Sequence, residues 1–489
     1  MTATRKFLIF FLLLFLNLFS SSIYAQDLIG EIKISENEKN ITNLSGALND
    51  SISFHIIINK DKNTNEYVST IHFYNESSLT KQLFIFRGSE IPVYLAFHVN
   101  NSILTLTSEL QNKIVVTDVD YLNEKVSSND IQMTPKSIFS HKNITYLVRQ
   151  IDFETIDLAV IKTSDNISRY FIGSNTKSEK KLFTSMFSDK LEFINDQQFI
   201  EKGSLKKYKG FYYNENLVFI FDDENGGDVE IYIINNSGVL SSKKIIVEKH
   251  AKIKKMNSFL KDNFLFTFYM LKDVAYLNIY DMLTLNLVKR IDYTENELGP
   301  RNKVVVNGVE QSNDVFNPKA FYNSFFPQAI GSVYNPELYI GVNKSVEGNY
   351  ILQIGHADKN NFYNESAFNF WWSYPAFQVN YNISSGIMSV NFNPNSVTLL
   401  VFEALASEKR KGNYFELQLD KNLTKLEEPQ SPEYHYIDVK SYNNRLKNVM
   451  KLKNHFLIIL KNTVRLINFD KESDSYKLYN LPFVKYKRI

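Results

Sequence analysis

An acidic turn holds the residues of this chain that are best suited to bind a metal ion. The turn is Asp222–Asp228, with the sequence DDENGGD, and it lies between two apolar runs. Ca²⁺ prefers several oxygen ligands from a tight loop, and Asp222, Glu224 and Asp228 could supply carboxylates. No distal Glu completes an EF-hand loop, and Asp, Asn and Gly are also typical of ordinary hairpin turns. We therefore keep two interpretations, a Ca²⁺ site and a solvated turn, and expect no other cofactor.

Two histidines in an earlier hairpin could share a transition-metal ion. If the turn centres between Asn63 and Thr64, His55 and His72 lie directly opposite each other on neighbouring strands. Opposite residues have Cβ atoms about 5 Å apart, which would allow two imidazoles to hold zinc or copper. A zinc site needs a further protein ligand, and neither a Cys nor a nearby carboxylate on that face supplies it. The alternative is a hydrogen-bonded histidine pair.

The most aromatic stretch outside the N-terminal segment is Asn361–Phe377, with the sequence NFYNESAFNFWWSYPAF. It contains both tryptophans, Trp371 and Trp372, together with Tyr374. A surface loop with exposed aromatic side chains could stack on a sugar or form a hot spot for a protein partner. Large aromatic side chains also bury well against their own domain, so internal packing is the alternative.

The sequence patterns of common enzymes are missing. No Ser lies in a G-x-S-x-G turn, no H-E-x-x-H pair occurs, and no glycine-rich phosphate loop is present. Paired acids for glycoside hydrolysis cannot be chosen by position from 53 carboxylates. We therefore name no catalytic residue and expect a protein without catalytic activity.

β-Branched and aromatic runs separated by Asn, Asp or Gly turns recur along the chain, as in β-hairpins. Most have a further strand-like run before or after them, which indicates four strands per unit. Some strands, such as Phe264–Met270, are apolar on both faces, which is typical of strands between two sheets. Eight hairpins begin at Ser51, Ser102, Asn143, Asn216, Asn263, Pro336, Ser396 and Asn454.

This repeat resembles the β-propeller superfamily, whose blades span about 40–50 residues. The resemblance implies an all-β fold, a single β-propeller of seven or eight four-stranded blades. The strand Leu28–Ile34 would complete the last blade and leave no open edge. The motifs of the WD40, kelch, sialidase and peptidase types are absent, with Gly226–Gly227 as the one Gly-Gly pair. Tandem β-sandwich domains are the alternative, although no Pro/Gly/Ser linker marks a domain boundary.

Residues 1–25 have the pattern of a secretory signal peptide. Arg5 and Lys6 precede the apolar run Phe7–Phe19, and small residues lead to a cleavage site after Ala25. The run is shorter than the about 20 residues that span a bilayer, and no later segment reaches that length. We expect residues 26–489 to be one soluble, propeller-like domain with loop insertions near 176–207, 295–325 and 357–377. The first insertion contains a segment that could form a short helix.

Cysteine is absent, so the chain has no disulfide, no thiolate metal site and no acylation site of a lipoprotein. Once Arg5 and Lys6 are removed with the signal, Lys+Arg equals the 53 Asp+Glu. A balanced surface charge gives no electrostatic footprint for nucleic acid. These features favour the periplasm or the exterior of a bacterium.

We interpret the chain as an exported, non-catalytic propeller that serves as a protein-interaction scaffold in the bacterial cell envelope. Its partner would be an envelope or surface protein, bound through the tryptophan insertion or the long loops. The alternative is a glycan-binding or glycan-active propeller with its site at the ring axis.

Overall fold

The computed structural model describes residues 27–194 without 142 and 189, and residues 206–293 without 249–251 and 273. It further describes 304–306, 309–311, 336–358, 379–382, 387–390, 413–426, 433–437, 455–460, 463–482 and 485–487. The chain divides into two compact units, one of residues 1–91 with 450–483 and one of residues 92–449 with 484–489.

The first unit contains two antiparallel sheets of four strands each. One has the order β2-β3-β4-β5 and consists of β2 (Glu38–Ala47), β3 (Ser53–Asp61), β4 (Tyr67–Tyr74) and β5 (Leu79–Gly88). The other has the order β1-β33-β32-β31 and consists of β1 (Asp27–Lys33), β31 (His455–Ile459), β32 (Thr463–Asp470) and β33 (Ser475–Pro482).

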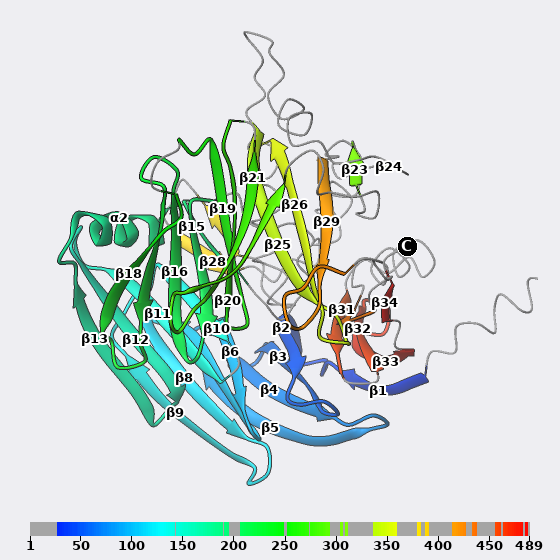
Figure 1. Ribbon diagram of the computed structural model, residues 1–489. Helices are drawn as coiled ribbons and strands as arrows, with labels where there is room; N and C mark the ends of the chain where they lie inside the picture. Colours follow the sequence, from blue (N-terminus) through cyan, green and yellow to red (C-terminus); the bar gives the residue numbers. More distant parts are fainter. Residues whose placement is uncertain are drawn as a thin grey trace, which may run out of the picture. The chain divides into compact units, whose positions relative to one another are not determined.

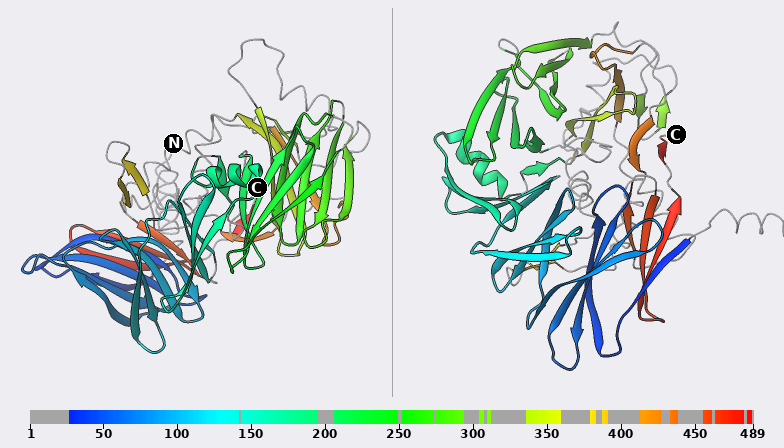
Figure 2. Two further views of the ribbon diagram at one scale, coloured as in Figure 1. Left: turned by 90° about the vertical axis from the view of Figure 1, so that its left-hand side faces the viewer. Right: turned by 90° about the horizontal axis from the view of Figure 1, so that it is seen from below.

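The N-terminal strand β1 lies in the sheet of the C-terminal strands. It runs antiparallel to β33, with Leu28 opposite Tyr479 and Ile32 opposite Tyr476. The right-hand view of Figure 2 shows the blue β1 beside these red strands. The prediction that Leu28–Ile34 completes the last sheet is therefore confirmed. Because β1 pairs with β33, the backbone groups on that side of β33 do not form an open edge.

The second unit contains five larger sheets in the part of the chain that the structure describes (Figure 1). The first two are meanders of β6 (Val93–Asn100), β7 (Ile103–Leu110), β8 (Lys113–Asp120) and β9 (Lys125–Ile131), and of β10 (Ser137–His141), β11 (Ile144–Gln150), β12 (Thr155–Thr163) and β13 (Asn166–Gly173). The next holds β15 (Tyr208–Tyr213), β16 (Asn216–Asp223), β17 (Asp228–Ile234) and β18 (Leu240–Ile246), with the short β14 (Leu191–Phe193) parallel to β15. A fourth meander is β19 (Lys255–Lys261), β20 (Phe264–Met270), β21 (Ala275–Asp281) and β22 (Leu287–Tyr293).

The fifth sheet of this unit has the order β24-β23-β29-β26-β25. Its strands are β23 (Val304–Val306), β24 (Val309–Gln311), β25 (Pro336–Lys344), β26 (Tyr350–Asp358) and β29 (Asn413–Leu419). Two short pairs complete the described structure, β27 (Val379–Asn382) with β28 (Ile387–Val390), and β30 (Glu433–Ile437) with β34 (Lys485–Lys487).

One of the predicted hairpins, Ser396–Leu419, is not a unit of its own. Its second strand, β29, pairs with β26 and places Phe415 opposite Ile354. It therefore joins the sheet of the preceding hairpin, while residues 396–412 lie outside the described residues. The described chain thus forms seven sheets of four or five strands. The fold is all-β and built from the four-stranded antiparallel sheets that form propeller blades.

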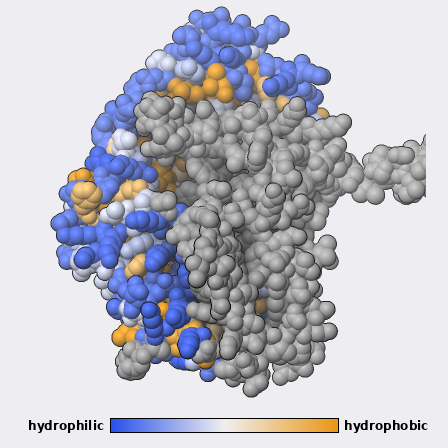
Figure 3. Space-filling model, turned by 90° about the horizontal axis from the view of Figure 1, so that it is seen from above, coloured by the Kyte–Doolittle hydropathy of each residue, from blue (hydrophilic) through white to orange (hydrophobic). Residues whose placement is uncertain are grey.

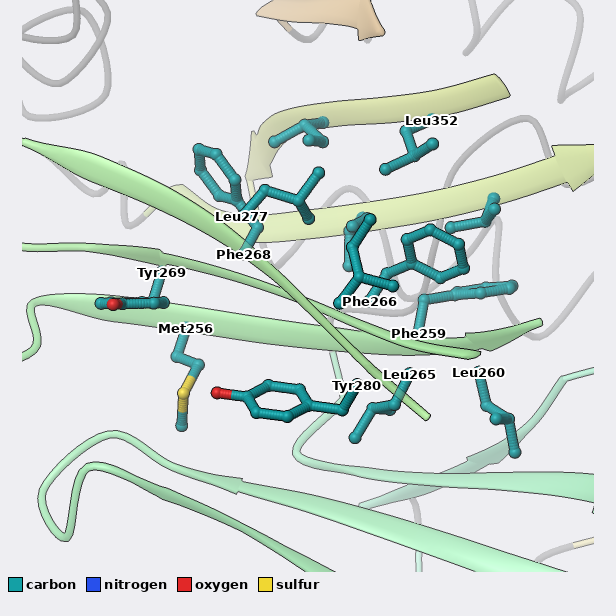
Figure 4. Packing of buried hydrophobic residues seen from close by; sticks show 14 of the residues in the cluster. Met256, Phe259, Leu260, Leu265, Phe266, Phe268, Tyr269, Leu277, Tyr280 and Leu352 are labelled. Atoms are coloured by element: carbon teal, nitrogen blue, oxygen red, sulfur yellow. The ribbon is translucent and has the colours of Figure 1, made fainter. Parts of the chain in front are cut away.

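Apolar side chains fill the spaces between successive sheets of the second unit. In the β19–β22 sheet, Figure 4 shows Phe268 and Leu277 directed toward Leu352 on β26, and Leu265 and Tyr280 directed the opposite way. These five side chains are all buried. A sheet packed on both faces needs apolar residues at successive positions, which explains why β20 does not alternate.

One α-helix, α2 (Lys177–Met186), occurs among the described residues, inside the insertion predicted to hold a short helix. Thr176 and Glu179 form a capping box, because the Thr176 side chain accepts from the Glu179 amide and the Glu179 side chain accepts from the Thr176 amide. Leu182 and Phe183 are buried in the core between the β10–β13 and β14–β18 sheets. In the described part of the chain, no helix has the length and apolar character of a membrane-crossing segment.

Candidate functional site

A row of polar residues crosses all four strands of the β2–β5 sheet. Ser45 on β2 lies opposite His55 on β3, and His55 lies opposite His72 on β4. His72 in turn lies opposite Gln82 on β5. The predicted register of His55 and His72 is therefore confirmed. Because opposite residues point to the same face of a sheet, the row places two imidazoles side by side.

Both imidazoles are buried, and each has one ring nitrogen with a hydrogen-bond partner. The Nδ1 atom of His55 lies 2.5 Å from the Ser45 hydroxyl, and the Nε2 atom of His72 lies 3.3 Å from the Thr70 hydroxyl. The other two ring nitrogens, Nε2 of His55 and Nδ1 of His72, have no hydrogen-bond partner within the described structure. The His55 ring also packs edge-on against Tyr476, with ring centroids 4.7 Å apart.

Burial disfavours the charged form of both imidazole rings. It lowers the pKa of His72 to about 4 because the charged form is poorly solvated there. The pKa of His55 is well below its usual value, through burial and through repulsion from a protonated His72. Neutral imidazoles can accept hydrogen bonds or bind metals, so the pair has the protonation state that either role needs.

A small polar cavity of about 120 Å³ adjoins His72 within the first unit. Thr70, Asn59 and Gln82 also line it, and Glu38 closes one side with a hydrogen bond from the Asn59 amide at 2.8 Å. The cavity is large enough for ordered water, and its amide, hydroxyl and carboxylate groups suit a small hydrogen-bonding molecule.

The zinc or copper hypothesis for His55 and His72 stays a prediction. No group of three or more His, Asp and Glu side chains is arranged as metal ligands in the described part of the chain. Sequence reasoning placed the two histidines but missed Ser45 and Gln82. Extending the same register rule to β2 would have indicated Ser45. Gln82 could not be found in this way, because a bulge between Phe73 and Tyr74 shifts the pairing of β4 with β5 by one residue.

The stability of the folded protein should depend on pH through His72. A His72 pKa near 4 in the folded state, against about 6.5 unfolded, means that the unfolded chain binds more protons between these values. The free energy of unfolding therefore has its full value, as far as His72 is concerned, above about pH 6.5. It falls by about 3 kcal/mol as the pH drops toward 4. His72→Gln should remove this part of the pH dependence in urea unfolding. An unchanged slope between the variant and the parent protein would contradict the burial account.

The acidic turn connects β16 to β17, and its carboxylates have separate partners. Asp222 on β16 forms a buried ion pair with Lys209 and accepts from the Ser258 amide at 3.1 Å. Glu224 accepts from the Met256 amide at 3.2 Å. Ser258 and Met256 both lie on β19, so two acidic residues of the turn join the β14–β18 sheet to the β19–β22 sheet.

The third predicted ligand, Asp228, pairs with Lys244 at 2.6 Å. Gly227 turns the chain with φ of +69°, and a Cβ there would lie 2.5 Å from the Glu248 carbonyl oxygen. Only glycine fits this position without displacing backbone. The hairpin with a glycine turn is thus confirmed, whereas the Ca²⁺ site at Asp222, Glu224 and Asp228 stays a prediction.

A groove of about 350 Å³ follows the outer strand β22 in the second unit. It is lined by Lys289, Arg290, Ile291 and Asp292 on β22 and by Thr424 and Lys425 after β29. The Arg290 guanidinium lies 4.0 Å from the centre of the Tyr276 ring and donates to Asp292 at 3.0 Å. The groove was not predicted from sequence, because its two walls come from segments far apart in the chain.

The aromatic candidates Trp371, Trp372 and Tyr374 lie outside the described residues. Their role in binding therefore stays a prediction. On the face drawn in Figure 3, the described surface is mainly hydrophilic and carries small hydrophobic patches.

Comparisons with known proteins find solved structures with low TM-scores and low sequence identity. No protein-family model matches the chain, and no curated protein matches it. An apocarotenoid oxygenase variant of Synechocystis is similar with a TM-score of 0.25 and 7% identity over 53% of this chain, which spans 63% of that protein's length. Hsv2 of Kluyvelomyces marxianus is similar with a TM-score of 0.23 and 11% identity, over 69% of this chain and 92% of that one.

An uncharacterized protein of Listeria monocytogenes is similar with a TM-score of 0.27 and 9% identity, over 67% of this chain and 82% of that one. Similarities at this level carry nothing about activity. The fold class rests on the strand pairing of the chain itself.

Proposed function

We propose that this protein is exported and works as a non-catalytic interaction scaffold in a bacterial cell envelope. The observation that carries the proposal is the groove along β22, where a strand edge and charged side chains lie together at the surface. Surface sites held by a rigid framework are common places for partner binding. The signal-like segment in residues 1–25 supports export.

The structural contacts of several acidic side chains also favour a scaffold. Asp222, Glu224 and Asp228 hold neighbouring strands or lysines. Asp157 lies between two arginines, and Arg149 and Arg169 donate to it at 2.7 and 2.6 Å. These groups stabilise the sheets, which leaves surface groups such as Lys289 for partner contacts.

Affinity purification after mild cross-linking in the native envelope tests this proposal. One dominant envelope protein should copurify with the tagged chain. Lys289→Glu should reduce its recovery about tenfold, because reversing a charge at an interface costs on the order of 1.4 kcal/mol. Lys243→Glu is the matched control, since Lys243 is exposed on the outer strand β18 outside the groove. A chain that is retained in the cytoplasm, or that copurifies with no partner, would refute the proposal.

A further inference from the structure

We propose that the groove along β22 binds an extended, acidic segment of a partner protein, which adds to the β19–β22 sheet as a further strand. This inference rests on the proposed scaffold function and names the chemistry of the partner. Strand addition to an open sheet edge is a general mode of peptide recognition, in which backbone hydrogen bonds provide affinity and side chains provide selectivity.

The groove exposes the edge of a strand and not one face of a sheet. Lys289, Arg290, Ile291 and Asp292 are consecutive, and successive side chains of a strand point to opposite faces. Lining by four consecutive residues fits a groove that follows the strand edge, because side chains of both faces reach it. The sheet order is β19-β20-β21-β22, so β22 has a strand partner on one side within the described structure. Its other side carries backbone donors and acceptors at alternate residues.

The charges of the groove favour an acidic occupant. Lys289, Arg290 and Lys425 are cationic, and Asp292 is the one acidic residue among the six that line it. Arg290 is fixed by its stacking on Tyr276 and by its bond to Asp292, so less side-chain entropy is lost when a ligand binds. Leu287 and Val288, each about half exposed, offer apolar contacts at the end of the strand.

The neighbouring sheet shows how this chain covers such an edge. There, β23 pairs with β29, with Val304 opposite Phe415, and β24 follows beyond it. The β19–β22 sheet has four strands, whereas its neighbours on either side have five. Strand β22 has 7 residues, so a bound segment of about seven residues would match it in length.

Fluorescence anisotropy with a synthetic peptide tests the inference on the purified full chain. The probe alternates glutamate and valine over about nine residues. It should bind saturably. N-methylation of alternate peptide amides on the pairing side should weaken binding at least about tenfold, because methylation removes backbone donors. Lys289→Glu should weaken binding about tenfold and Lys243→Glu should leave it unchanged.

Several results would overturn strand addition. Equal binding of the N-methylated peptide would show that charge alone holds the ligand, and binding of heparin without the peptide would identify a sulfated glycan as the occupant. No saturable binding up to about 1 mM would also reject it. These failures are distinct from failure of the scaffold proposal, because a partner could still copurify from the envelope and depend on another surface.

Discussion

Replacing Asp222 by alanine is expected to lower the free energy of unfolding by about 3–5 kcal/mol. The side chain of Lys209 is fully buried, and Asp222 is its ion-pair partner. Removing the carboxylate leaves an uncompensated buried charge, and it also removes the acceptor of the Ser258 amide. Urea unfolding followed by circular dichroism measures the change.

Two further variants test whether the unpaired charge of Lys209 causes this loss of stability. Lys209→Met with Asp222→Leu should recover most of the lost stability, because a well-packed apolar pair often replaces a buried ion pair without loss. Asp130→Ala is the control, since its pair with Lys113 is half exposed and worth at most about 1 kcal/mol. Equal effects of Asp222→Ala and Asp130→Ala would contradict the account.

The same unfolding experiment distinguishes a structural Asp222 from a Ca²⁺ ligand. If the turn binds Ca²⁺, excess Ca²⁺ should stabilise the parent protein and a chelator should remove that gain. We expect Asp222→Ala to destabilise the protein equally with Ca²⁺ and with chelator. A loss of stability that appears only with Ca²⁺ would support the metal site.

Arg465→Ala is expected to lower the free energy of unfolding by at least about 3 kcal/mol, through unsatisfied carbonyls and a cavity. Arg465 on β32 is fully buried and donates to the carbonyl oxygens of Tyr74 and Asn75 at 3.1 and 2.7 Å. It also donates to the Ser53 hydroxyl. A further hydrogen bond, 3.2 Å long, goes to the side-chain oxygen of Asn480. This one guanidinium therefore holds β32 against the β2–β5 sheet.

Lys477→Ala on the neighbouring strand is the matched control for Arg465→Ala. Lys477 pairs with Asp470 at 2.5 Å, and both side chains are partly exposed. Such an exposed pair contributes little to stability, because water screens both charges. In thermal or urea unfolding, Arg465→Ala should therefore lose much more stability than Lys477→Ala. A loss below about 1 kcal/mol for Arg465→Ala would show that water replaces the guanidinium bonds.

Local rules predicted much of the fold. In an antiparallel hairpin opposite residues have a constant sum of numbers, so the turn near Asn63 was enough to place His55 opposite His72. The strand at Leu28–Ile34 was predicted to complete the last sheet because it stood alone in sequence, and it pairs with β33. Its partner strand β33 is distant in sequence, but the local pattern already indicated a strand without a neighbouring strand to pair with.

Features that depend on distant segments could not be predicted. The hairpin at Ser396–Leu419 matched the local pattern, yet β29 pairs with β26 because pairing is decided by tertiary packing. Arg465 is a single cation within an apolar strand, and its carbonyl acceptors come from the β2–β5 sheet. The groove likewise needs Thr424 and Lys425 beside β22.

A photo-reactive residue placed at Val288 tests the central claim, partner binding at β22, most directly. Val288 is 50% exposed on β22, and Val239, which is 57% exposed before β18, is the matched control position. Illumination of the native envelope should attach one dominant partner at position 288 and little at position 239. Equal cross-linking at both positions, or none at position 288, would contradict a scaffold that binds its partner through β22.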